Sequence, residues 1–419
     1  MRASNEARFS PVRTARAAQL AAQAAQDAGV ILHTASGSAY TGRHVSFEEH
    51  RCMNFGSCSY LGLECRSDLR LGVEDAVRRF GTQFPFARIF LQCPLYEELE
   101  ANLASIAGRP VLVCSNTTFC HISAIPLLVS SRDAVVIDQF AHASMQMALG
   151  MLHGVEITHL RHSHMSQLRK VVGQLSQSHD AVWYICDGLY SMLGDFAPLD
   201  SLAGMLEEFP KLHIYADDAH STSWVGQRGR GCVLDSFADH ERVVVTLSLN
   251  KAFSAAGGAL AFPSSELYWK VRRGAGPMIF SGPIQPPMLG AAVASSRFHL
   301  SEDFSLLQQG EAQRIRLAME LASKYEIPLG SPDASPIFFV PCGPEEAAYA
   351  LARSLVQSGY YASPSTFPAV PRKHAGIRFT ISMHNELADI EGFISTLARE
   401  YGRLGISRHR SSSKRSSTT

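Results

Sequence analysis

Short apolar runs rich in β-branched residues recur through the middle of the chain, and several of them are followed by polar or glycine-rich residues. These runs are predicted strands, at 111–115, 134–138, 181–187, 212–217, 243–248 and 258–262. Segments with helical periodicity lie between several of them, including 66–80, 95–107 and 166–176. Strands that alternate with helices favour an α/β fold, with a mostly parallel sheet and helices on both faces.

The C-terminal third has a different pattern. A Pro- and Gly-rich segment at 280–290 predicts a connector, and a long helical stretch follows to about residue 324. The remainder predicts a compact α+β unit, with strands at 336–341 and 376–382 and helices at 345–358 and 386–402. We therefore expect an N-terminal helix and arm at 1–60, a large domain at 61–290, a small domain at 291–405 and a disordered basic, Ser-rich tail at 406–419.

The composition is that of an ordinary globular protein. The 419 residues are 46% hydrophobic and 18% charged, and 38 basic residues balance 38 acidic ones, so charge gives no case for nucleic acid or an anionic membrane as partner. The nine cysteines show no CxxC spacing, which predicts reduced thiols and a cytoplasmic protein. No apolar run reaches the roughly 18 residues that a membrane span needs.

Both ends of the chain leave an alternative open. The Ala- and Arg-rich segment 13–30 has the composition of a transit peptide, but Glu6 and Asp27 favour an N-terminal helix packed on the body of the protein. The basic tail could make a charge-driven contact, although its lack of apolar residues is typical of a solvated, disordered segment.

Two strand ends carry the most informative chemistry. Asp217 and His220 follow the strand at 212–217, and Ser248 and Lys251 follow the strand at 243–248. The carboxyl ends of parallel strands are where ligands bind in such sheets. Either pair alone would more often lie in a surface loop, but a lysine at the end of a buried strand is hard to explain by packing. An acid, an imidazole and a lysine at neighbouring strand ends suit pyridoxal 5′-phosphate, with a Schiff base on Lys251 and with Asp217 on the pyridine nitrogen.

A histidine cluster invites a metal-site interpretation. Its members are His153, His159, His162 and His164. Their spacing matches no common structural zinc pattern, so we expect no metal there. The segment around His162 is instead predicted to open a helix.

With these residues placed, the chain from about 50 to 402 resembles the α-oxoamine synthase family of fold-type I pyridoxal-phosphate enzymes. The resemblance follows several segments in the family's order: NFGSCSYLGLE (54–64), IDQFAHASM (137–145), CDGLYSMLGDFAPL (186–199), the two strand ends above and GIRFTIS (376–382). It implies a large cofactor-binding domain, a small C-terminal domain and a homodimer with active sites at the subunit interface.

The resemblance also implies roles for individual residues. Lys251 would attach the cofactor and act as base, and Asp217 would pair with the pyridine nitrogen. His220 and Ser191 would lie near the phenolic oxygen, and His142 would stack on the ring. Ser248 would bind the phosphate beside the loop that contains Thr117 and Thr118, and Arg378 would hold the substrate carboxylate. A satisfied loop histidine remains the alternative for His142, and a surface arginine on an edge strand is the alternative for Arg378.

The chain departs from the family pattern at several positions. Cys58 and Ser59 replace an Asn-Asp pair, Thr117 and Thr118 replace a glycine and an aromatic residue, Asp187 replaces a glutamate, and Gly282 replaces a threonine that reaches the neighbouring subunit's phosphate. Two segments, PFARIF (85–90) and SLNKAF (248–253), are similar to cholera-type autoinducer synthases. That similarity predicts a medium or long acyl chain in contact with Phe84, Phe86, Ile89 and Phe90.

The expected reaction is condensation of an amino acid with an acyl thioester, from coenzyme A or a carrier protein, to give an α-amino ketone. An aminotransferase or amino-acid lyase would use the same Asp-Lys pair and is the main alternative. A non-catalytic, partner-binding member of the family is a second alternative, and the presence of Lys251 argues against it.

Overall fold

The computed structural model describes residues 11–37 and 39–406, and these divide by their contacts into two compact units. Unit 2 comprises residues 58–191 and 195–311, and unit 1 comprises the chain up to Ser57, residues 192–194 and the chain from Ala312. The expected tail at 406–419 lies outside the described residues apart from its first position. Among the described residues, no helix is both long enough and apolar enough to cross a membrane.

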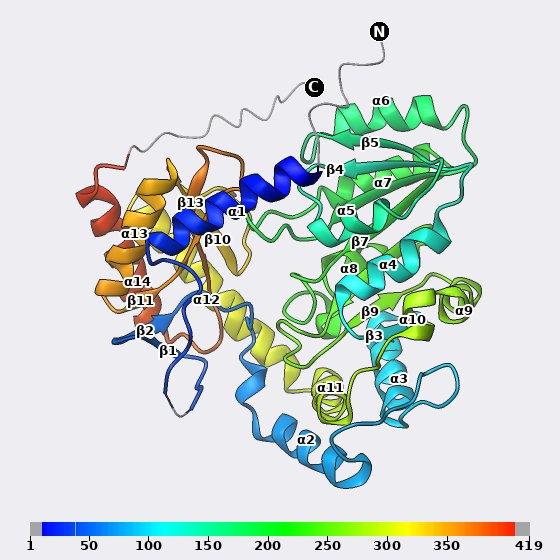
Figure 1. The fold of residues 1–419 in the computed structure, drawn as a ribbon, viewed down its shortest axis with the longest axis horizontal. Coiled ribbons are helices and arrows are strands. Elements are labelled where there is room, and N and C mark those ends of the chain that lie inside the picture. Colours follow the sequence, from blue (N-terminus) through cyan, green and yellow to red (C-terminus); the bar gives the residue numbers. More distant parts are fainter. Residues whose placement is uncertain (1–10, 38, 407–419) are drawn as a thin grey trace. The chain divides into compact units, whose positions relative to one another are not determined.

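Unit 2 is built on a sheet whose strand order is β3-β9-β8-β7-β6-β4-β5 (Figure 1). Strands β4 to β8 pair in parallel, whereas β9 is antiparallel to both β8 and β3. The strands are β3 (Val111–Cys114), β4 (Ala134–Asp138), β5 (Glu156–Leu160), β6 (Val182–Asp187), β7 (Leu212–Asp217), β8 (Val243–Ser248) and β9 (Gly258–Ala261). This arrangement confirms the predicted α/β fold with a mostly parallel sheet.

Helices cover both faces of this sheet. They are α2 (Ser67–Phe80), α3 (Leu95–Ala107), α4 (Thr117–Leu128), α5 (Ala143–Leu149), α6 (Met165–Leu175), α7 (Leu199–Glu208), α8 (Cys232–Phe237), α9 (Ser265–Gly274), α10 (Gly276–Phe280) and α11 (Pro286–His299), with short 3₁₀ turns η2 (Leu63–Cys65) and η3 (Gln227–Gly229). Gly72 and Gly290 let α2 and α11 cross closely, because a Cβ on Gly290 would lie 2.1 Å from the Gly72 carbonyl oxygen. Helix α12 (Phe304–Lys324) carries the chain from unit 2 into unit 1.

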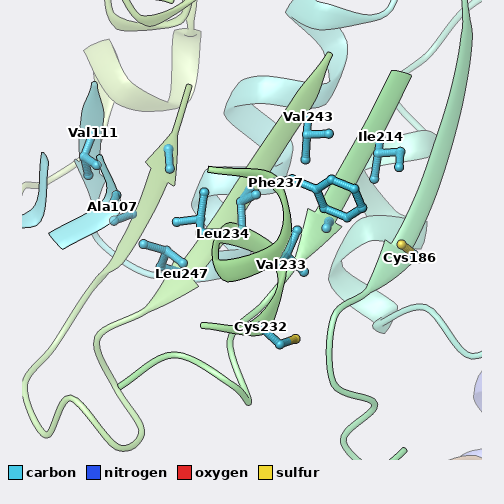
Figure 2. Close-up of a cluster of buried hydrophobic side chains, with 14 of the residues drawn as sticks. Ala107, Val111, Cys186, Ile214, Cys232, Val233, Leu234, Phe237, Val243 and Leu247 are labelled. Carbon is cyan, nitrogen blue, oxygen red and sulfur yellow. The ribbon is translucent and has the colours of Figure 1, made fainter. Parts of the chain in front are cut away.

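Successive strand residues alternate between two apolar layers, as the period of two requires. Ile214, Val243 and Val245 belong to one layer. Helix α8 packs on this layer through Val233, Leu234 and Phe237 (Figure 2). The opposite layer holds the intervening strand residues, such as Tyr215 and Val244, together with α4 and α5. A side chain near the end of a strand therefore faces a predictable layer.

Unit 1 contains two small sheets with their helices. One has the order β1-β2-β11 and the other β10-β13-β12. The elements are α1 (Pro11–Asp27), β1 (His44–Phe47), β2 (His50–Asn54), β10 (Ile337–Gly343), α13 (Glu345–Gln357), β11 (Tyr360–Tyr361), β12 (Ser363–Ser365), β13 (Ala375–Thr380) and α14 (Leu387–Arg403). Phe55 stacks on Phe393 at 4.1 Å between ring centroids, and Arg43 hydrogen-bonds Asp389.

The boundaries of these units differ from the expected domains. The N-terminal segment is not a separate arm, because β2 pairs with β11 and the segment groups with the C-terminal residues. The division near residue 290 lies instead inside α12, between Glu311 and Ala312. The Pro- and Gly-rich segment predicts a loop, but a loop need not be a domain boundary. Helix α11, which follows it, belongs to unit 2 because it packs against α2 and α3.

Candidate active site

Three strands of unit 2 end in polar residues on the same face of the sheet. Asp187 ends β6, Asp217 ends β7 and Ser248 ends β8. Their even spacing from Trp183, Tyr215 and Val244 places all three on the face covered by α4. Two carboxyl groups and a hydroxyl group therefore lie on one face of the sheet, at the carboxyl ends of its strands. Lys251 lies in the turn that follows Ser248.

Asp217 is the best-defined member of this group. Its side chain is buried, Oδ1 accepts a hydrogen bond from the Ala219 N–H at 3.0 Å, and Oδ2 lies 3.0 Å from His121 Nε2. Burial by itself would raise the pKa of this carboxyl group, but the hydrogen bond from His121 and the positive charge of the groups around it, Lys251 among them, hold it below its usual value. Asp217 is therefore a buried carboxylate that stays ionised, and Lys251 lies near enough to act on it.

His220 is fixed in the turn that follows β7. Its Nδ1 lies 2.8 Å from the Tyr60 hydroxyl, and its backbone carbonyl accepts a hydrogen bond from Trp224 Nε1 at 2.7 Å. The ring is buried, so its orientation is set by Tyr60 and not by solvent. The structure thus brings His220 to the same end of the sheet as Asp217.

The loop between β3 and α4 can hold an anion. Asn116 caps α4 by accepting a hydrogen bond from the Phe119 N–H at 2.9 Å, and Thr117 and Thr118 begin the helix with half-buried side chains. Gly258 pairs with Ser248 in the sheet, and a Cβ at Gly258 would lie 2.6 Å from the Thr117 nitrogen. The glycine therefore lets the first turn of α4 approach the end of β8, where helix N–H groups and the Ser248 hydroxyl could bind phosphate.

His142 lies at the start of α5 with an exposed ring. Its Nδ1 lies 2.6 Å from the Ser144 hydroxyl, and its backbone N–H donates to Asp187 Oδ1 at 2.9 Å. Asp187 thereby ties the His142 turn to the end of β6. The exposed ring leaves a face available for stacking.

Ser191 and Arg378 are the remaining predicted residues. Ser191 is half-buried, four residues beyond the end of β6. Arg378 lies in unit 1, whereas the site described above is confined to unit 2. The edge-strand alternative for Arg378 was wrong, because β13 is the central strand of its sheet and the side chain is buried between Phe339 and Ser363 in register.

The structure gives two of the clustered histidines other tasks. His162 lies between Asp138 and Asp195, and His164 caps α6 by accepting a hydrogen bond from the Gln167 N–H. The predicted helix after His164 is confirmed as α6.

Sequence reasoning missed His121, which is fully buried on α4 and reaches Asp217 from a different part of the chain. A signal was present in the sequence. In the described helix TTFCHISAIPLL, His121 is the only ionisable side chain other than a cysteine thiol. A buried imidazole needs a partner, but the sequence does not say which one.

The fold and the motifs agree with known proteins. The family model for aminotransferase class I and II matches residues 50–392. An 8-amino-7-oxononanoate synthase of Anaeromyxobacter dehalogenans is 30% identical over 358 residues, which cover 83% of this chain and 85% of that protein. A putative 8-amino-7-oxononanoate synthase of Desulforudis audaxviator is 29% identical over 347 residues, 82% of this chain and 88% of that protein.

Among solved structures, serine palmitoyltransferase from S. paucimobilis, with a PLP–myriocin aldimine bound, has a TM-score of 0.86 and 21% identity. The match covers 94% of this chain and 99% of that one. This likeness confirms the predicted fold, a large α/β domain with a smaller C-terminal part. The family model and the sequence relatives show that the chain belongs to the aminotransferase class I and II family and, within it, to the α-oxoamine synthases, which are pyridoxal-phosphate-dependent acyltransferases.

Proposed function

We propose that this protein joins an amino acid to the acyl group of a thioester and releases the free thiol, with Lys251, Asp217 and His142 around the cofactor. The observation that carries the proposal is the buried, ionised Asp217 beside Lys251, at the same sheet edge as Ser248 and the first turn of α4. Pyridoxal phosphate supplies an electron sink for negative charge at the amino acid's α-carbon when it is bound.

The residues of unit 2 fit that cofactor. The N–H groups of Thr117 and Thr118, with the Ser248 hydroxyl, would hold the phosphate at the N-terminus of α4. Asp217 would accept the proton of the pyridine nitrogen, because its carboxylate remains charged although it is buried. His142 would lie against the ring, and His220 and Ser191 would donate toward the phenolic oxygen.

Lys251 would take the α-proton of the amino acid. We assign this role to its Nζ because the family resemblance places the cofactor there and because the charge of Lys251 acts on Asp217. Arg378 would bind the substrate carboxylate through two parallel hydrogen bonds, the geometry that a guanidinium offers to a carboxylate. The departures at Cys58 and Ser59 lead us to assign the carboxylate to Arg378 alone.

The acyl donor is proposed to carry a medium or long chain. Phe86, Ile89 and Phe90 are exposed on unit 2, with Phe90 87% exposed, whereas Phe84 packs on the core. Exposed aromatic residues of this kind suit an apolar partner. The names of the relatives, 8-amino-7-oxononanoate synthase and serine palmitoyltransferase, fit acyl transfer of different chain lengths.

We also propose a homodimer in the cytoplasm. Phe280 is 88% exposed and lies, like Phe90, on unit 2, so a second copy that covers both would remove a large apolar area from water. The nine cysteines are free thiols, which is typical of a reducing compartment. Sedimentation at several concentrations tests the dimer, and a fully active stable monomer would contradict it.

The reaction is tested by a screen of amino acids against acyl thioesters, with free thiol and product mass measured together. We expect one thiol released for each α-amino ketone, and none from a Lys251→Ala control. Formation of a keto acid without thiol release would indicate an aminotransferase. This alternative is tested because the matching family model is that of the class I and II aminotransferases. Borohydride should fix the cofactor on Lys251, and a tag on another lysine would contradict its role.

A series of thioesters from acetyl to octanoyl tests the chain length. Each desolvated methylene would contribute about 0.8 kcal/mol. Four extra methylenes should therefore raise kcat/KM by roughly a hundredfold, at about 1.4 kcal/mol per tenfold. A flat or falling series would indicate a short acyl donor.

A further inference from the structure

A chain of buried side chains connects Asp217 to α4 and β8. His121 Nε2 lies 3.0 Å from Asp217 Oδ2, and His121 Nδ1 lies 2.9 Å from the Tyr215 hydroxyl. The Tyr215 hydroxyl lies in turn 2.9 Å from Thr246 Oγ1. All of these side chains are buried, and they come from α4, β7 and β8. No role proposed above uses His121, Tyr215 or Thr246.

A second carboxyl group lies beside Asp217. Asp187 is its register partner on β6, points to the same face and is also buried. Two neighbouring carboxyl groups in a dry site do not both ionise easily, so one of them tends to keep a proton. Burial and the nearby charge of Asp217 raise the pKa of Asp187 well above its usual value, opposite to the shift of Asp217.

Several groups surround this pair, but few of them distinguish its members. Lys251 favours the charged form of both carboxyl groups. Asp138, Asp218, Cys120 and Cys186 are also near, and none of them is a cation. His142 acts on Asp217 by charge and on Asp187 through its backbone N–H. His121, in contrast, distinguishes the two carboxyl groups, because its side chain hydrogen-bonds Asp217 and not Asp187.

We propose that His121 is a positioning residue that keeps the negative charge of this carboxyl pair on Asp217 and leaves the proton on Asp187. The inference rests on the proposed contact of Asp217 with the pyridine nitrogen. His121 donates its Nε2 proton to Asp217 Oδ2 and accepts a proton from the Tyr215 hydroxyl at Nδ1. Thr246 donates to the Tyr215 oxygen. Tyr215 thereby fixes the tautomer of His121, and His121 fixes the carboxylate.

The first arm of the test uses cofactor-free protein. Imidazole ¹H–¹⁵N spectra should show the proton of His121 on Nε2, with Nδ1 as an acceptor, across neutral pH. Tyr215→Phe should shift the Nδ1 resonance of His121, because Nδ1 no longer receives a hydrogen bond from the phenol. A His121 signal protonated on Nδ1 only, or one unchanged by Tyr215→Phe, would overturn the proposal.

The second arm uses the loaded enzyme. His121→Leu should lower kcat by about 10- to 100-fold, as substitutions behind a directly bound group commonly do, with KM for the amino acid little changed. The pH dependence of the bound cofactor's visible absorbance should also move. His121→Gln, which can still donate to Asp217, should retain more activity than His121→Leu and guards against a folding defect.

The decisive variant is the double substitution His121→Leu with Asp187→Asn, compared with Asp187→Asn alone. If His121 decides where the charge resides, removing the competing acid should restore kcat at least several-fold relative to His121→Leu. A purely structural role for His121 would not be rescued in this way, and no rescue would overturn the proposal. Asp217→Asn distinguishes a failure of the proposed function from a failure of this inference. Full activity of Asp217→Asn would contradict the proposed role of Asp217. An impaired Asp217→Asn together with a fully active His121→Leu would contradict only the inference about His121.

Discussion

Unit 2 contains two histidine–aspartate clusters on opposite faces of one sheet, one fully buried and one half-buried, and they have different roles. The site cluster, His121 with Asp217 and Asp187, lies on the face covered by α4. The second cluster, His162 with Asp138 and Asp195, lies on the other face, because Asp138 alternates with Ile137 along β4. We call this second group the buttress cluster.

The two histidines differ in what lies at their second nitrogen. His162 contacts a carboxylate at each nitrogen, at 3.1 Å to Asp138 Oδ1 and 2.6 Å to Asp195 Oδ2. Burial alone would lower the pKa of His162, but the hydrogen bonds and charges of the two aspartates raise it to about 9. His121 contacts one carboxylate and one phenol. A histidine between two acids is a cation that joins the end of β4 to two loops, whereas one between an acid and a phenol can orient a carboxylate.

The largest expected effect breaks the site cluster. Asp217→Asn should lower the rate of α-proton exchange by about 10²- to 10⁴-fold, the range of a lost proton-transfer partner. The neutral amide no longer stabilises a proton on the pyridine nitrogen. Exchange of the substrate's α-proton with deuterium, followed by mass spectrometry, measures the effect. Exchange at the wild-type rate would show that Asp217 has another role.

Breaking the buttress cluster should affect stability instead. His162→Ala leaves Asp138, which is fully buried, without its cation, and this should lower the free energy of unfolding by about 3–5 kcal/mol. Urea unfolding measures the loss. His159→Ala is the matched control, because His159 is an exposed residue on neighbouring β5 and its removal should change stability by less than about 0.5 kcal/mol. Equal effects of the two variants would contradict the buttress role.

The same cluster predicts a loss of stability in alkali. Because the pKa of His162 is raised to about 9 in the folded state, the folded protein binds more protons than the unfolded chain between about pH 6.5 and 9. The stabilisation is complete below about pH 6.5 and is lost as the pH rises through 9, with a maximum of about 3 kcal/mol at 1.36 kcal/mol per pKa unit. Urea unfolding at pH 6, 8 and 10 measures this, and the slope should vanish in His162→Ala.

The smallest expected effect concerns the support of His220. Tyr60→Phe removes the hydroxyl that lies 2.8 Å from His220 Nδ1 and should lower kcat about fivefold, equivalent to about 1 kcal/mol for one hydrogen bond. The ring itself stays in the core, so the melting temperature should change little. Steady-state kinetics beside a thermal melt distinguishes this result from a general loss of packing, which would lower both.

Much of the sheet followed from the sequence, because buried parallel strands are short, continuous apolar runs that no other element explains as well. The strands ending at Asp217 and Ser248 appear where they were predicted. Strand β5 was missed because it lies at the sheet's edge and carries exposed polar residues such as Glu156 and His159. The hairpin of β1 and β2 was missed because its residues are mostly half-buried and lack the apolar run of a central strand.

In the candidate site, too, some features followed from the sequence and others only from the tertiary structure. The sequence determined that Lys251, Asp217, Ser248 and His220 come to one edge, because each follows a strand directly and parallel strands end together. Only the tertiary structure decided that α4 carries His121 to Asp217, and that Asp187 lies beside Asp217 on the adjacent strand. The face of the sheet to which a strand residue points depends only on its position along that strand, because successive side chains alternate between the two faces. The protonation of two carboxyl groups depends on burial and on partners from distant segments, and folding alone brings these together.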